Sequence, residues 1–301
     1  RRLNRKVGAN IGWPLGHQFK GILRGEGFNN SDSYVNGDVF VSSDTLDQLR
    51  TAGFKAELEF KTNNLNRKQY ANAGKAFSFT LQYFNLHEDF RPGNTSVESA
   101  PVKDRHQWFR FKASAEQYFR AGWYRPGYFA QAVLSNQSFF QNYYGTLINA
   151  PGFNPIQDSR TLLLENFRAF NYVAGGFRNV FTLRNRLDLR FEAYVFKPID
   201  YLQQDIHQEA TVIHDLRKMY FASTAGLVMH SPIGPISLSV NYYDDKQNQL
   251  GVLLHVGFLL LLLFGLIANR GRGSVRIDMY YVRGLNASIE HRGLQRPGGT
   301  E

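Results

Sequence analysis

The stretch GPISLSVNYY, residues 234–243, alternates strictly between apolar and polar side chains. Successive side chains of an extended strand point to opposite faces. One face therefore carries Ile236, Leu238, Val240 and Tyr242, and the opposite face carries Ser237, Ser239 and Asn241. In a soluble sheet the apolar row faces a core, whereas in a membrane barrel it faces lipid and the polar row lines an aqueous lumen. The fold depends on which of these two rows is wet.

Four further segments show the same period of two. They are FKAELEFK (54–61), FSFTLQYF (77–84), FRFKASAE (109–116) and LDLRFEAYVF (187–196). An amphipathic helix would instead repeat every 3.6 residues or so, so these segments are predicted to be strands. Three of the polar rows are charged, with Lys55, Glu57, Glu59 and Lys61 in the first, Arg110, Lys112 and Glu116 in the third, and Asp188, Arg190 and Glu192 in the fourth.

The whole pattern predicts about eleven strands. We place them at 5–12, 19–28, 52–61, 76–86, 107–119, 125–135, 167–180, 185–197, 217–230, 234–244 and 250–261. Most come near the roughly 9–11 residues that a tilted strand needs to cross a bilayer. They exceed the roughly 5–6 residues that are usual for strands of globular proteins.

The connections between these strands alternate in length. Short connections alternate with long ones, which lie at 29–51, 87–106, 136–166 and 198–216. Outer-membrane barrels show this asymmetry, with short turns at one rim and long loops at the other. The segment 62–75 is too long for the short side, and 244–249 is brief for the long side. The stretch VNGDVFV (35–41) resembles a strand, but a crossing there would break the alternation, so we place it in a loop.

We therefore predict an all-β fold, an antiparallel transmembrane β-barrel whose charged rows face the lumen. A soluble sandwich or barrel is the alternative, because it could expose such rows to solvent. It would not usually need eleven strands of this length with such asymmetric loops.

The composition bounds the other classes of protein. Mean hydropathy is −0.37 over 301 residues, and such a value does not exclude a barrel, whose alternating strands dilute the signal. The absence of cysteine rules out disulfides, thiolate metal sites and cysteine nucleophiles. The net charge is +10, but lysines and arginines are interleaved singly with acids and aromatics. We therefore expect no nucleic-acid partner.

Longer segments carry a resemblance to a known family. The chain contains FNPIQDSRTLLLENFRAFNYVAGGFRN (153–179), LDLRFEAYVFKPI (187–199) and SPIGPISLSVNYYDDKQNQLGVLLHVGFLL (231–260), and NNLNRKQYANAG (63–74) fits the same pattern. These segments resemble the C-terminal outer-membrane barrel of Bacteroidetes patatin-like phospholipases. That barrel is similar to the BamA-like surface-antigen superfamily of assembly and translocation proteins, which has sixteen strands.

The resemblance implies a location in the bacterial outer membrane. Bacterial single-chain barrels have even strand numbers, so we expect an incomplete barrel, about eleven strands of sixteen, whose first and last strands are edges. The leading prediction of function is a barrel that anchors or exports a patatin-like phospholipase. Its partners would be outer-membrane lipids and the parent's own N-terminal hydrolase domain. Two alternatives stay open: a BamA-like barrel for protein insertion or translocation without a hydrolase, and a soluble β-rich binding protein.

Motifs of catalysis are missing from the sequence. No G-x-S-x-G elbow occurs, and ASTAG (222–226) opens with Ala222 where the strained turn needs glycine. We also identify no base beside a serine, so we expect no esterase activity from this chain alone. We expect no cofactor and no metal site, the triplet His87, Glu88 and Asp89 included.

The resemblance also implies a contact inside the lumen. In the superfamily a long loop enters the barrel, and the arginine of its Val-Arg-Gly-aromatic motif meets an acid of the wall. The corresponding loop here, 136–166, lacks that motif. We expect Arg160 or Arg168 to take the place of that arginine, with Asp188 or Glu192 as the wall partner.

The C-terminal region divides at about residue 262. Residues 251–268 are nearly all apolar and long enough for a membrane helix. We prefer a strand, because Val252, Leu254 and Val256 continue the alternation, and Phe258 or Phe264 would be its closing aromatic residue. We therefore expect a barrel domain over 1–262 and a tail of uncertain status over 263–301, for which a shifted reading frame is one explanation and a real extension is the other.

Overall fold

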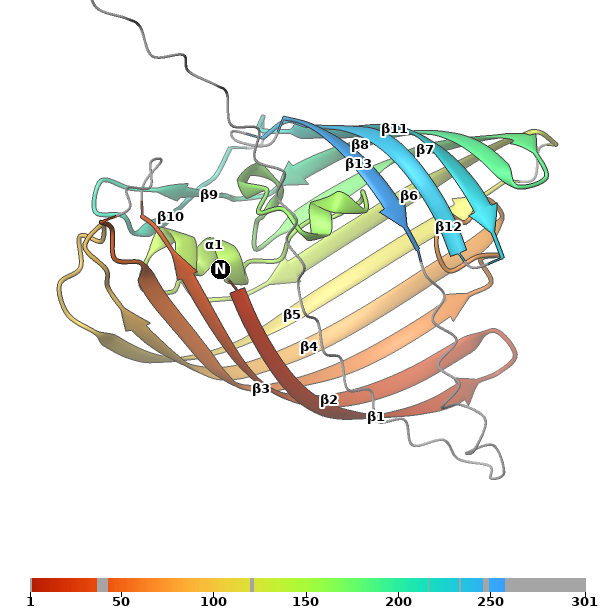
Figure 1. The fold of residues 1–301 in the computed structure, drawn as a ribbon. Coiled ribbons are helices and arrows are strands. Elements are labelled where there is room, and N and C mark those ends of the chain that lie inside the picture. Colours follow the sequence, from red (N-terminus) through yellow and green to blue (C-terminus); the bar gives the residue numbers. More distant parts are fainter. Residues whose placement is uncertain are drawn as a thin grey trace, which may run out of the picture.

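The computed structural model describes residues 2–36, 43–119, 122–215, 217–232, 234–245 and 249–257. Eleven strands form one curved antiparallel sheet in the order β1-β2-β3-β4-β5-β6-β7-β8-β11-β12-β13 (Figure 1). Their bounds are β1 Arg2–Leu15, β2 Phe19–Tyr34, β3 Asp47–Asn63, β4 Gly74–Arg91, β5 Val102–Tyr118, β6 Tyr124–Ser135, β7 Tyr172–Arg184, β8 Leu187–Pro198, β11 Tyr220–Ser231, β12 Gly234–Tyr243 and β13 Leu250–Val256. A described strand therefore overlaps each of the eleven predicted ones, although the bounds differ.

The decisive stretch, 234–243, is strand β12, and its apolar row lies on the outside of the curve. Leu238 is 53% exposed and Val240 is 51% exposed, whereas Ser237 and Asn241 are buried on the inside. The same facing holds on β8, where Phe191 is exposed and Arg190 is buried. A water-soluble sheet would bury the apolar row, so the outer face of this sheet has the polarity of a surface that contacts lipid.

Four strands are longer than predicted at the end where the long loops lie. Strand β2 continues to Tyr34, β3 begins at Asp47, β4 continues to Arg91 and β5 begins at Val102. The outward residues of these extensions are polar, among them Asn29, Ser31, Gln48, Arg50, Asp89 and Arg91. The outward row of apolar residues therefore ends before the strand pairing does. The sheet extends beyond its apolar band at the end where the long loops lie.

The loop between β6 and β7 lies inside the curve of the sheet (Figure 1). It carries the helix α1 (Tyr143–Asn149) and two short 3-10 turns, η1 (Asp158–Arg160) and η2 (Glu165–Phe167). The predicted start of a strand at 167 is therefore wrong, because β7 begins only at Tyr172. Four apolar loop residues pack against inward aromatic side chains of the wall: Phe153, Ile156, Leu164 and Phe167. The main core thus lies in the lumen.

A small hairpin was not predicted. Strands β9 (Tyr201–Gln204) and β10 (Ala210–Ile213) form it within the connection between β8 and β11. Leu202 and Ala210 of the hairpin pack against Tyr143 and Leu147 of α1. The hairpin therefore covers the helix at the long-loop end of the sheet.

The two outermost strands, β1 and β13, each pair with one neighbour in the described part of the chain. Among the described residues the sheet does not close, which is consistent with the prediction that both are edges of an incomplete barrel. Residues 250–256 form a strand with Val252 and Leu254 on the outer face, so strand was the correct choice over helix for this part. Phe258, Phe264 and the expected tail 263–301 lie outside the described residues. No helix in the described ranges is long and apolar enough to cross a membrane.

Candidate functional site

A network of buried charges occupies the inner wall at β5, β7 and β8. Arg178 of β7 pairs with Glu116 of β5 and lies 3.7 Å, Nε to Oε2, from Glu192 of β8. Arg190 of β8 pairs with the same Glu192 at 2.8 Å. The side chains of these four residues are between 5% and 19% exposed. Because each buried carboxylate has a cationic partner, the network avoids the large cost of an unpaired buried charge.

Two tyrosines complete this network. Arg178 donates through Nε to the Tyr194 hydroxyl at 2.7 Å, and Tyr194 donates to Glu192. Arg190 donates to the Tyr118 hydroxyl at 3.1 Å. The period-two alternation of β8 explains this arrangement, since residues 188, 190, 192 and 194 share its inner face.

The connection between β3 and β4, residues 64–73, folds into the lumen and binds Asp188. Arg67 lies 3.2 Å from Asp188 Oδ2, and the Asn72 amide donates to the same oxygen at 3.0 Å. Two wall residues, Thr182 and His230, also contact this carboxylate, at 2.9 Å each. Asp188 is 1% exposed. This one buried acid of the wall thus binds two residues of the connection, Arg67 and Asn72.

Tyr70 lies at the tip of this connection, with a φ of 51°. A left-handed conformation is unusual for a residue with a side chain, and here it directs the ring into the lumen. The Tyr70 hydroxyl lies 2.7 Å from the Ser237 hydroxyl of β12. Arg190 donates to the neighbouring Ala71 carbonyl at 2.8 Å. The tip is therefore bound to both β8 and β12.

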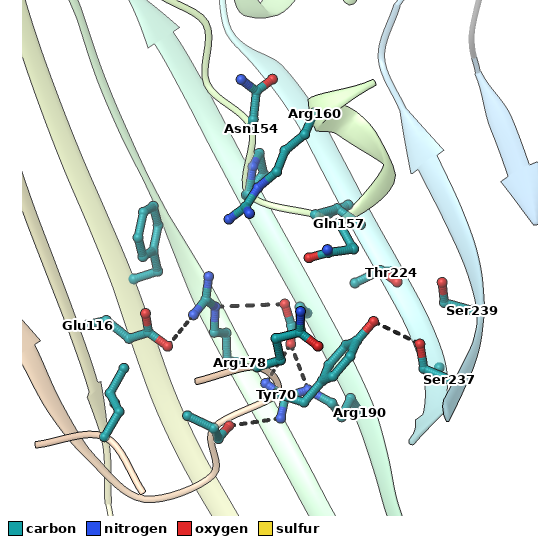
Figure 2. Close-up of a pocket in the computed structure, with 18 of the residues that line it drawn as sticks. Tyr70, Glu116, Asn154, Gln157, Arg160, Arg178, Arg190, Thr224, Ser237 and Ser239 are labelled. Atoms are coloured by element: carbon teal, nitrogen blue, oxygen red, sulfur yellow. Dashed lines mark hydrogen bonds and ion pairs between the residues drawn. The ribbon is translucent and has the colours of Figure 1, made fainter. Parts of the chain in front are cut away.

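A cavity of about 540 Å³ separates this connection from the β6–β7 loop. Figure 2 shows Tyr70 on one side of the cavity and Arg160 and Asn154 of the loop on the other. Its charged lining consists of Arg67, Lys68, Lys112, Arg160, Arg178 and Arg190 against Glu116 and Glu192. Hydroxyl and amide groups from Gln131, Gln157, Thr224, Ser237 and Ser239 add to it. Such a lining suits water or a small anion and not an apolar ligand.

The expected loop-to-wall pairs do not form in the described structure. Arg168 donates instead to the carbonyls of Leu147, Ile148 and Ala150, at 3.0–3.2 Å. The last carbonyls of a helix have no partner within the helix, and α1 ends at this point. Burial among these groups lowers the pKa of Arg168 to about 10.

The other three predicted site residues have different surroundings. Arg160 lines the cavity, Asp188 binds the β3–β4 connection, and Glu192 pairs with Arg178 and Arg190. Both acids therefore lie on the inner wall as expected, but with other partners. The partners follow from the tertiary path of residues 64–73, which the sequence does not show.

One loop-to-wall contact has the opposite polarity to the expected one, because its acid comes from the β6–β7 loop. Asp158 of η1 accepts from the Asn241 amide at 2.6 Å and from the Tyr243 hydroxyl. Asn166 donates through its backbone N–H to Asp245 at 3.1 Å. Sequence reasoning missed Asp158, Arg67, Tyr70 and Asn72. The one available signal was the excess length of 62–75 on the side of the short turns.

The triplet at residues 87–89 does not converge on one point. Glu88 faces inward and contacts His106, while His87 and Asp89 belong to the opposite, outward row of β4. In the part of the chain that the structure describes, no group of three or more His, Asp or Glu side chains could hold a metal ion.

Comparison with known proteins returns little. No family model matches the chain, and no curated protein matches it. Among solved structures, it is similar to BamA from Haemophilus ducreyi lacking POTRA domains 1–3, with 12% identity and a TM-score of 0.46. The match covers 84% of this chain and 53% of that one, so the chain spans about half the length of that structure.

Proposed function

We propose that this chain forms the wall of an outer-membrane β-barrel whose lumen is blocked by the β3–β4 connection and the β6–β7 loop. We further propose that this barrel anchors or exports an attached patatin-like phospholipase. The main observation for a blocked lumen is that Asp188 of the wall binds Arg67 and Asn72 of the β3–β4 connection. The β6–β7 loop fills the other end of the lumen through its apolar core and Asp158. A barrel filled from both ends suits an anchor or a gated exporter better than an open pore.

The energetics support a closed resting state. Asp188 and Glu192 are buried and paired, and removing one partner of a buried pair typically costs about 3–5 kcal/mol. Withdrawing the connection from the lumen would remove Arg67 and Asn72 from Asp188 together. Opening therefore needs an input of free energy, such as the binding of a passenger segment.

The likeness of residues 153–179, 187–199 and 231–260 to the barrel of patatin-like phospholipases supports the choice of passenger. The second candidate is insertion or translocation of other proteins without a hydrolase. It is favoured by the resemblance of the same segments to the BamA-like superfamily of assembly and translocation proteins.

Fractionation of cells that express the whole gene product tests the proposal. We expect this chain and a phospholipase activity to sediment together with the outer membrane. Deletion of residues 1–257 should release that activity into the soluble fraction. If the chain sediments without any associated hydrolase, and its depletion causes other outer-membrane proteins to accumulate unfolded, the second candidate is correct. Sedimentation of neither would exclude both.

Conductance of the whole gene product, inserted in planar bilayers, tests separately whether the lumen is blocked. We expect little steady current from the unmodified protein, and an increase after Asp188→Asn. A large steady current from the unmodified protein would contradict a closed lumen.

A further inference from the structure

Three residues at the long-loop end of the sheet form a chain of hydrogen bonds. His106 of β5 lies with Nε2 2.7 Å from Oε2 of Glu88 on β4. Its other ring nitrogen, Nδ1, lies 2.8 Å from the Ser138 hydroxyl in the β6–β7 loop. None of them belongs to the lumen cavity or to the residues that hold the β3–β4 connection. The chain runs from carboxylate to imidazole to hydroxyl.

The hydrogen-bond partners determine the state of the imidazole. A carboxylate only accepts hydrogen bonds, so His106 Nε2 must carry the proton that it shares with Glu88. In the neutral ring Nδ1 is then an acceptor, and the hydrogen bond from Ser138 Oγ–H fits it. A serine whose hydroxyl donates to an imidazole that a carboxylate orients is an activated nucleophile. In the serine-protease triad Nδ1 binds the carboxylate and Nε2 binds the serine. Here Nε2 binds the carboxylate and Nδ1 binds the serine, so the two nitrogens have exchanged roles.

Packing holds the base in place, while Ser138 as a residue is exposed. His106 is 3% exposed and Glu88 is 2% exposed. The Phe140 ring stacks on the imidazole with 4.4 Å between centroids, and the second Glu88 oxygen accepts from the Gln141 backbone N–H at 3.1 Å. Ser138, in contrast, is exposed. A serine whose only role was to hydrogen-bond a buried histidine would not need to be exposed to solvent.

Exposed apolar side chains lie in the chain segments that flank Ser138 and His106. Phe139 is 43% exposed, Leu134 is 52% exposed and Phe109 is 54% exposed. Asn136, two residues before the serine, hydrogen-bonds to Phe109 through both its backbone N–H and its side chain. The nucleophile therefore comes shortly after the outward apolar row of β6 ends, and the exposed Phe139 next to it offers an apolar contact for an acyl chain.

We propose that Ser138, His106 and Glu88 form a hydrolytic site for carboxylic esters of long acyl chains. The expectation that no base lies beside a serine is wrong, because Glu88, His106 and Ser138 come from three separate segments that only the fold brings together. The site belongs to this chain and does not depend on the function proposed above.

The reaction follows from the geometry. Ser138 Oγ attacks the ester carbonyl carbon while its proton passes to His106 Nδ1. The bond from carbon to the alkoxy oxygen then breaks, the same proton passes to that oxygen, and the alcohol leaves. Water attacks the acyl-serine, gives a proton to Nδ1, and the carboxylic acid departs as Ser138 recovers the proton. Glu88 remains a carboxylate and stabilises the imidazolium in each half-reaction.

Hydrolysis of long-chain nitrophenyl esters by the full chain, refolded in detergent, tests this proposal. We expect turnover that Ser138→Ala lowers about 100-fold or more, with a smaller loss on a short-chain ester. Ser135→Ala is the matched control, because Ser135 lies in the same segment and donates to the Phe109 carbonyl and not to a histidine. This variant should keep its activity.

Labelling with a fluorophosphonate gives a second, independent readout. We expect the label on the peptide that contains Ser138, and its loss in His106→Gln, with heat-modifiable gel mobility showing that each variant has folded. If His106→Gln does not fold, Glu88→Gln serves in its place, and Ser138→Ala alone still decides the assay, since Ser138 is exposed. No turnover together with no label at Ser138, or equal turnover in Ser138→Ala, would overturn the proposal.

Discussion

Replacement of Asp188 by asparagine should release the β3–β4 connection from the lumen. The carboxylate accepts from Asn72 and pairs with Arg67, and both partners belong to this connection. Asparagine keeps the volume of the side chain but removes its charge and places an N–H₂ group among donors. Asn72 would then face a site with fewer acceptors.

The size of the effect follows from these two contacts. A hydrogen bond to a charged group contributes about 1.5–3 kcal/mol, and Arg67 is 30% exposed, so its share is at the low end because solvent screens it. We expect the closed position of the connection to lose about 2–3 kcal/mol in total. Each 1.4 kcal/mol is a factor of ten, so the open population should rise about 30- to 150-fold.

Limited trypsin digestion of the folded protein measures this population. Arg67 and Lys68 lie in the connection, and cleavage follows the open population when opening and closing are faster than cleavage. We expect the cut after residues 67 and 68 to accelerate by the factor given above. Asp200→Asn is the matched control, because Asp200 also pairs with a histidine, His214, but at an exposed site. Equal cleavage rates in Asp188→Asn and the unmodified protein, or an equal increase in Asp200→Asn, would refute the reasoning.

Three further predictions concern the wall and the lumen. Leu238→Arg should weaken folding into lipid vesicles by about 2–4 kcal/mol, because the outward row faces hydrocarbon. Ser239→Arg places its side chain in the cavity and should fold nearly as well as the unmodified protein; the reverse order would mean that the facing is inverted. Arg178→Met should lower the free energy of unfolding in urea by about 3–5 kcal/mol, since two buried glutamates lose their shared cation, and a loss below about 1 kcal/mol would contradict this. Asp158→Ala should accelerate tryptic cleavage after Arg160, because the loop loses its bonds to β12; unchanged cleavage would show that the apolar core alone holds the loop.

The strands and their facing could be predicted from the sequence, because both depend on a local property. Side chains alternate along any extended backbone, so the rows of β8 and β12 were already separated in the printed letters. The charged row at residues 188, 190 and 192 marked the inner face correctly. The ends of the strands could not be predicted, because the outward residues beyond the apolar band, such as Asn29 and Arg50, are as polar as loop residues.

The partners of the inward charges were decided by the tertiary structure alone. Arg67 and Asp188 are 121 residues apart in the chain, and they meet because the β3–β4 connection turns inward instead of into solvent. His106 and Ser138 are 32 residues apart, and His106 and Glu88 are 18 residues apart. Alternation tells which face a side chain occupies, but the register of neighbouring strands and the path of the loops determine which side chain it meets. Those depend on packing across the whole lumen, and no short stretch of sequence contains that information.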